Sequence, residues 1–171
     1  MRRIRIAVVS ALIVISLTTS AVFAGRGHFT GSVIFTLGSL NASGTLAGLG
    51  NRDVLVTLEG SGIGTATCTN KGGNQAPGQN PIQVNVSGVQ TIVASLIDNG
   101  SAPFSVATDA PPMPSARAAG CPNNNWKVTS LFVSWTSAVI TVSDALTGEV
   151  LLRQDFACTT TSTSVSCTPT P

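Results

Sequence analysis

The stretch DVLVTLE, residues 53–59, indicates the fold because apolar and polar side chains alternate in it one by one. Val54, Val56 and Leu58 fall on one face of an extended chain, and the residues between them fall on the other. A period of two residues is typical of a β-strand with one buried and one solvated face. The stretch therefore predicts a strand whose sheet covers a core on one side.

The same alternation recurs along the rest of the chain. It predicts further strands at residues 32–37, 62–69, 82–87, 104–106, 131–135, 138–142 and 150–156. Trp135 shares the inward face of Leu131 and Val133, so we expect it in the core. The glycine-rich residues 37–51 suit turns and bulges. We predict an all-β fold: an antiparallel, immunoglobulin-like β-sandwich of about eight or nine strands.

The first 24 residues have the three parts of a secretory signal. Three arginines lie within the first five positions, residues 6–17 are apolar, and small residues precede a cleavage site after Ala24. An uncleaved membrane anchor is the alternative, but Ser and Thr crowd the second half of the apolar run. We predict a signal peptide at 1–24, a single domain at 25–171, a secreted or cell-surface location, and no membrane span after cleavage.

Removal of the signal changes the charge of the chain. Residues 25–171 carry six basic and seven acidic residues, so the apparent positive excess belongs to the signal. No basic patch is left to neutralise phosphates, which argues against a nucleic-acid partner. The remaining length is sufficient for one domain with a core.

Four cysteines lie in the predicted mature part: Cys68, Cys121, Cys158 and Cys167. An even number in an exported chain predicts two disulfides, for which three pairings exist. We favour Cys68–Cys121, because each borders an Asn/Pro-rich loop, and Cys158–Cys167, which would pin the C-terminal tail. No C-x-x-C pair occurs and the single histidine, His28, lies beside the predicted new N-terminus, so we expect no metal site.

Two polar loops interrupt the strand pattern, CTNKGGNQAPGQNP at residues 68–81 and DAPPMPSARAAGCPNNN at 109–125. One interpretation is structural: side-chain amides satisfy the backbone, and Gly and Pro fix its path. The other is a ligand site in which amides and an aromatic ring hold a sugar or a peptide. Its candidate residues are Asn70, Asn74, Gln75, Asn124 and Trp126. We favour the structural role for the first loop, and packing beneath the second for Trp126.

The sequence contains few of the residue combinations that catalysis requires. A serine nucleophile needs a base, and His28 lies near a terminus. No G-x-S-x-G motif occurs, and the possible carboxylate pairs fall on turns and outward strand positions. These pairs are Asp144 with Glu149, and Asp98 with Asp109. We therefore expect no enzyme activity and no cofactor.

Three segments resemble a group of small secreted bacterial proteins of uncharacterised function. They are GLGNRDV at residues 48–54, CTNKGGNQAPGQNP at 68–81 and CPNNNW at 121–126. The resemblance extends over about two-thirds of the predicted mature part, implies an exported β-domain and implies no activity. In a bacterium we expect the sequons that begin at Asn41, Asn85 and Asn99 to be chance matches.

Together these features predict an exported, non-catalytic β-sandwich that acts as a structural, adhesive or protein-interaction module at or outside the cell surface. The alternative is a carbohydrate-binding module that uses Trp126 and the amide-rich loops. The expected partner classes are a cell-surface protein and a polysaccharide.

Overall fold

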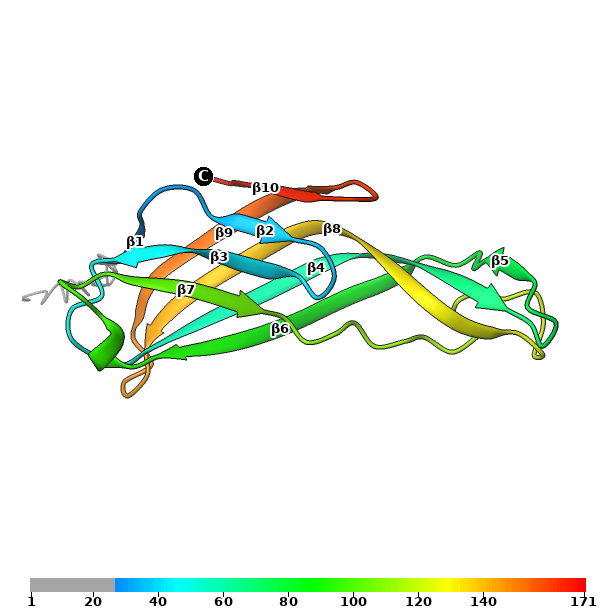
Figure 1. Cartoon of the computed structure of the whole chain (residues 1–171), viewed down its shortest axis with the longest axis horizontal. Coiled ribbons are helices and arrows are strands. Elements are labelled where there is room, and N and C mark those ends of the chain that lie inside the picture. The colour runs from blue at the N-terminus through cyan, green and yellow to red at the C-terminus, as the bar shows by residue number, and fades with distance from the viewer. Residues whose placement is uncertain (1–26) are drawn as a thin grey trace, which may run out of the picture.

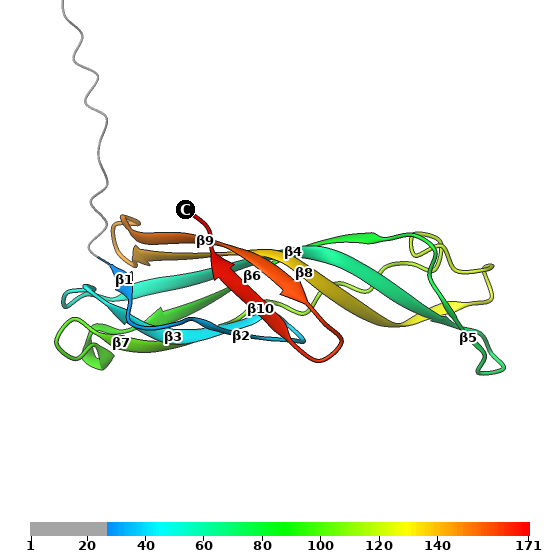
Figure 2. The same cartoon turned by 90° about the horizontal axis from the view of Figure 1, so that it is seen from above.

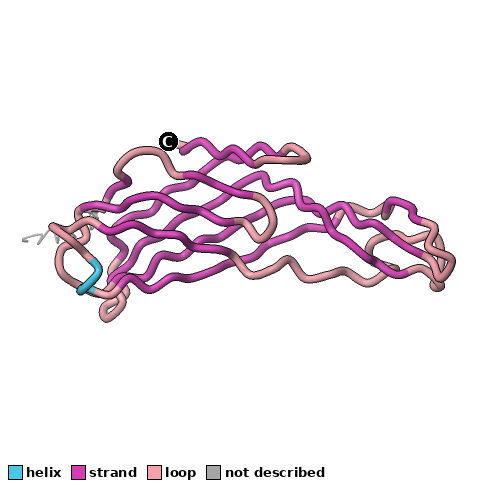
Figure 3. The backbone as a smooth tube through the Cα atoms, in the orientation of Figure 1, coloured by secondary structure: helices cyan, strands magenta, loops and turns pink. Residues whose placement is uncertain are grey.

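The structure, a computed structural model, describes residues 27–171, so the predicted signal peptide at 1–24 lies outside the described residues. In these residues ten strands form two antiparallel sheets, and the chain also contains one short 3-10 helix (Figures 1 and 3). The prediction of an all-β fold is confirmed for these residues. Within residues 27–171, no helix is both long enough and apolar enough to cross a membrane.

The smaller sheet is built around β3 (Asn41–Ala47). One edge of β3 pairs with β7 (Ala102–Ala107), and the other edge is shared by β1 (His28–Phe29) and β2 (Ile34–Thr36). β3 lies in a stretch where we expected turns. Gly44 leaves room for the ring of Phe104, the residue opposite it on β7, since a Cβ at this position would lie 3.1 Å from that ring.

The larger sheet has two long central strands, β4 (Val54–Thr69) and β8 (Lys127–Asp144). Beyond β8 follow β9 (Val150–Thr160) and β10 (Val165–Pro169). The other edge of β4 pairs first with β6 (Ile82–Ile92) and, further along, with β5 (Gln75–Pro77). The 3-10 helix η1 (Ala94–Leu96) lies between β6 and β7 in the chain.

β4 and β8 each join two predicted strands into one. Their register shifts between Ser61 and Gly62, where Thr136 is an extra residue in β8, so the pair contains a β-bulge. In a regular strand, residues three positions apart face opposite sides of the sheet. The extra residue at the bulge reverses this alternation, so Trp135 and Ala138 are both buried. The apolar alternation changes phase between residues 135 and 138. This change marks the bulge, whereas the sequence prediction treated it as the boundary between two strands.

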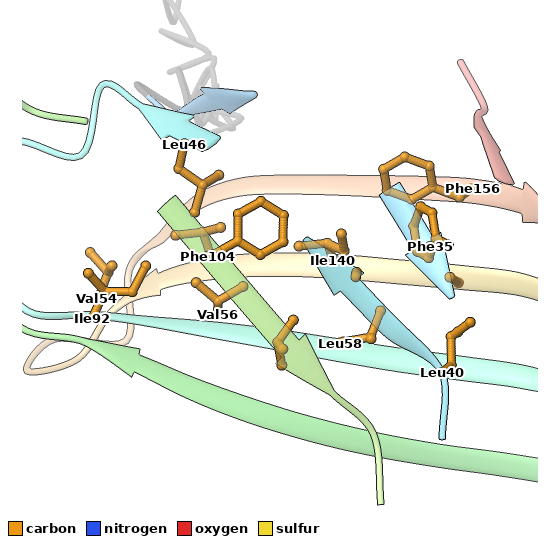
Figure 4. Close-up of a cluster of buried hydrophobic side chains, with 14 of the residues drawn as sticks. Phe35, Leu40, Leu46, Val54, Val56, Leu58, Ile92, Phe104, Ile140 and Phe156 are labelled. Atoms are coloured by element: carbon orange, nitrogen blue, oxygen red, sulfur yellow. The ribbon is translucent and has the colours of Figure 1, made fainter. Parts of the chain in front are cut away.

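A single apolar core lies between the two sheets (Figure 4). Leu46 and Phe104 from the smaller sheet face the apolar side chains of β4, β8 and β9. Phe35 and Phe156 meet edge to face with ring centroids 5.1 Å apart, an arrangement favoured by aromatic quadrupoles. Trp135 is 1% exposed, so its predicted core position is confirmed. Each such buried side chain contributes roughly 1.5–3 kcal/mol to folding.

The smaller sheet covers only one half of the larger sheet (Figures 1 and 2). We call the two-sheet half the body. The other half, which we call the arm, consists of residues 61–81 and 110–136: the distal part of β4, β5, a coil, and the first part of β8. In Figure 1 the arm extends to the right, away from the turn between β8 and β9.

Candidate functional site

Both disulfides that we favoured from the sequence are present. Cys68–Cys121 joins the two polar loops of the arm across 53 sequence positions, with the Cα atoms 5.8 Å apart. Cys158–Cys167 joins opposite positions of β9 and β10 and pins the C-terminal strand. Disulfides persist in oxidising compartments, so both bonds indicate an environment outside the reducing cytosol.

The first polar loop is organised by the side chain of Asn70. Its Oδ1 accepts backbone N–H bonds from Gly72 at 2.9 Å and from Asn74 at 3.0 Å. Asn70 N also donates to Asn74 O at 3.0 Å, and Gly73 adopts a positive φ of 80°. This part of the loop is a tight turn between β4 and β5 whose backbone is satisfied by an amide, which supports the structural interpretation.

The end of the same loop is joined to the coil that precedes Cys121. Asn80 donates through its backbone N to Ala119 O and through Nδ2 to Ala118 O, both at 3.2 Å. A Cβ at Gly78 would lie 2.6 Å from Ala119 O, so this close approach requires glycine. The two loops therefore hold each other by hydrogen bonds as well as by the disulfide.

The second loop ends in a turn that positions Trp126. Asn123 Oδ1 accepts the backbone N–H of Asn125 at 3.0 Å, and Asn123 O accepts that of Trp126 at 3.1 Å. The next residue, Lys127, is paired with Thr69 at the end of β4. The strand pairing therefore brings Trp126 close to Asn70, although 56 positions separate them in the sequence.

A shallow hollow of about 380 Å³ lies where the two loops meet at the end of the arm. Both loops contribute to its lining, and Trp126, which is half-buried, borders it. The lining residues are Asn70, Lys71, Gly72, Asn123, Asn125 and Trp126. Three other hollows on the described residues have similar volumes of about 360–400 Å³, so the meeting of the two loops, and not its size, distinguishes this one.

Of the five ligand-binding residues proposed from the sequence, the structure places two at the hollow and three away from it. Asn70 and Trp126 line the hollow together, whereas the other three are exposed and do not line it: Asn74, Gln75 and Asn124. Sequence reasoning missed four lining residues: Lys71, Gly72, Asn123 and Asn125. The Asn-x-Asn spacing was an available signal for a turn at 123–125, but nothing in the sequence alone distinguishes Lys71 from other loop lysines.

One of the two carboxylate pairs considered for catalysis, Asp144 with Glu149, contacts Arg52 in the body. Asp144 Oδ2 lies 3.3 Å from Arg52 Nη1, and Glu149 Oε2 lies 3.8 Å from the same nitrogen. Arg52 therefore links both ends of the turn that joins β8 to β9. This contact holds a hairpin at the end of the molecule opposite the arm (Figure 1).

Comparisons with protein-family models, with curated proteins and with solved structures found no match. The function is therefore inferred from the chemistry of the chain itself.

Proposed function

We propose that the protein is an exported, non-catalytic β-sandwich module with a structural, adhesive or protein-interaction role at or outside the cell surface, and that the arm is its contact surface. The observation that carries this proposal is the arm itself. Its outer part, beyond the core residues Val133 and Trp135, extends past the shared core, is braced by the Cys68–Cys121 disulfide and ends in two polar loops. Loops held by a rigid scaffold are a common site of recognition.

Two features support export of the protein. The disulfides suit an oxidising environment, and the first 24 residues match a secretory signal. Two antiparallel sheets around one core are consistent with an immunoglobulin-like sandwich, a class in which end loops carry recognition. The arm lengthens one end of such a body.

The rigidity of the loops lowers the free-energy cost of binding a partner. Binding by a flexible loop costs free energy, because side chains and backbone must be ordered in the complex. In the arm, the Asn70 turn, the Asn80 contacts and the disulfide already fix both loops. The groups in the hollow are carboxamides, an ammonium and an indole, which bind by hydrogen bonds, charge and stacking.

A second candidate function is carbohydrate binding at the hollow. The specific observation in its favour is that Trp126 borders a space which amide side chains from both loops also line. Aromatic rings pack well against the apolar faces of sugar rings, and amides hydrogen-bond to hydroxyl groups. This candidate uses the arm in the same way and differs only in the class of partner.

The proposed contact surface is tested by retention of the oxidised, exported protein on envelopes from producing cells. We expect Trp126→Ala to weaken retention about tenfold or more, because a ring at the centre of a contact is a typical hot spot. Phe132→Ala is the matched control, since Phe132 is also an exposed aromatic residue of the arm but does not line the hollow. Thermal unfolding would verify that both variants are folded.

Equal retention of Trp126→Ala and wild type would contradict the proposed contact surface. If Trp126→Ala does lose retention, treatment of the envelopes distinguishes the two candidates. Loss of retention after protease treatment indicates a protein partner. Carbohydrate binding is indicated by two results together. Retention survives protease treatment, and the wild-type protein gives specific signals on a glycan array that Trp126→Ala abolishes.

A further inference from the structure

Two of the amide side chains that line the hollow, those of Asn70 and Asn123, have a fixed orientation. Only the oxygen of a carboxamide can accept a backbone N–H, so the bonds from Gly72 and Asn74 fix the orientation of the Asn70 amide. The bond from Asn125 fixes the Asn123 amide in the same way. Within residues 27–171, the Nδ2 groups of Asn70 and Asn123 have no protein acceptor. The NH₂ groups are thus the free ends of both amides.

Lys71 adds a positive charge to this set of donors. It is exposed and lines the hollow. The salt bridges among the described residues all join Arg52 or Arg153 to acids of the body. The Lys71 ammonium therefore has no carboxylate partner within the part of the chain that the structure describes.

Charge is separated between the two halves of the molecule. The arm, residues 61–81 and 110–136, contains three basic residues, Lys71, Arg117 and Lys127, and no aspartate or glutamate. The seven acidic residues all lie outside those two segments. The arm consequently presents a positive potential, which attracts anionic ligands and is screened by salt.

Trp126 restricts the shape of a fitting ligand. The edge of the hollow that it forms suits a flat apolar face, while the amide NH₂ groups and Lys71 suit acceptors and negative charge. A saccharide that carries carboxylates, such as a uronic acid polymer, combines a ring with an apolar face, hydroxyl and carboxylate acceptors, and an anionic group.

We propose that the hollow at the end of the arm binds an anionic glycan of the uronic acid class, with a sugar ring against Trp126 and a carboxylate at Lys71. This inference rests on the carbohydrate-binding candidate above and adds the chemical class of the ligand. Neutral sugars would use the ring and the amides but would leave Lys71 without a partner.

The test compares two forms of one polymer on the oxidised, exported protein. Polygalacturonate carries carboxylates, and its methyl-esterified form has the same backbone without the charge. We expect binding to polygalacturonate, measured by calorimetry, to exceed binding to the ester about tenfold and to weaken as salt is raised. Lys71→Gln and Trp126→Ala should each lower the affinity for polygalacturonate about tenfold.

The matched control is Lys127→Gln, which removes an equal charge from an arm lysine that does not line the hollow. Its affinity should stay within about twofold of wild type. Equal losses in Lys71→Gln and Lys127→Gln would overturn the proposal, because binding would then follow the diffuse charge of the arm.

Two other results would overturn the inference and separate it from the proposed function. Equal binding of the ester and the acid, with loss in Trp126→Ala, would leave a sugar site without selection for an anion. Absence of polygalacturonate binding by a folded protein that is still retained on envelopes through Trp126 would refute the anionic ligand and leave the contact surface intact.

Discussion

Asp144 organises the end of the body opposite the arm through one carboxylate. Its Oδ1 accepts the backbone N–H groups of Leu146 and Thr147, each at 2.8 Å. These bonds, that from Thr147 first, lower the pKa of Asp144 below its ordinary value of 3.8, and the Thr147 hydroxyl and Arg52 add smaller effects in the same direction. Partial desolvation opposes them. Hydrogen bonds to the charged form thus outweigh burial.

This lowered pKa predicts a pH dependence of stability. A carboxylate with a lower pKa in the folded state stabilises that state above its unfolded pKa of about 4 and loses this contribution as the pH falls through the folded value. Asp144→Asn should therefore lower the melting temperature at pH 7, and the gap to wild type should narrow in acid. Thermal unfolding of both proteins at neutral and acidic pH measures this difference in melting temperature. A gap that stays constant with pH would contradict this role of the charge.

At the scale of elements, the sequence predicted the inward face of the strand at residues 53–59 but not where the strands end. Alternation is local, so Val54, Val56 and Leu58 could be assigned to the core directly. Continuity across the bulge at Thr136 depends on pairing with a strand distant in the chain, which local alternation does not reveal. β3 was missed because its small side chains show no apolar alternation.

The bulge between β4 and β8 predicts a requirement for glycine at position 62. A Cβ there would lie 2.5 Å from Ser134 O and 3.0 Å from Val133 Cγ1, and both belong to the paired strand. Gly62→Ala should lower the free energy of unfolding by about 1–3 kcal/mol, as overpacking does elsewhere. Urea unfolding measures the loss. Gly72→Ala, where the nearest atom is 3.4 Å away, is the control and should change stability by no more than about 0.5 kcal/mol. Equal stability of the two variants would show that the strand pair relaxes around the added methyl group.

The two disulfides should differ in their contribution to stability. Cys68–Cys121 closes a loop of 53 positions and Cys158–Cys167 one of 9. The chain-entropy model gives roughly 4 kcal/mol for the first and 2–3 kcal/mol for the second. Replacement of each pair by alanines, followed by urea unfolding, tests this order. Hydrogen exchange should also accelerate in both arm loops only when Cys68 and Cys121 are replaced. Unchanged exchange there would show that hydrogen bonds alone hold the loops.

At the scale of the whole molecule, the arm combines segments that the sequence keeps apart. Asn70 and Trp126 could be named as candidates from composition, and the favoured disulfide already implied that their loops meet. Lys71, Asn123 and Asn125 line one hollow with Asn70 and Trp126. The two loops meet there because of the register of β4 with β8, which no local pattern encodes. The separation of basic arm from acidic body likewise appears only after the fold has joined residues 61–81 to 110–136.

The central claim, that the end of the arm is the contact surface, is tested most directly by hydroxyl-radical footprinting of the protein free and bound to envelopes of producing cells. We predict that Trp126 becomes protected on binding, while Leu146, which is 94% exposed in the hairpin turn of the body, keeps its reactivity. Protection of Leu146 with unchanged oxidation of Trp126 would contradict the account and assign the contact to the opposite end of the molecule.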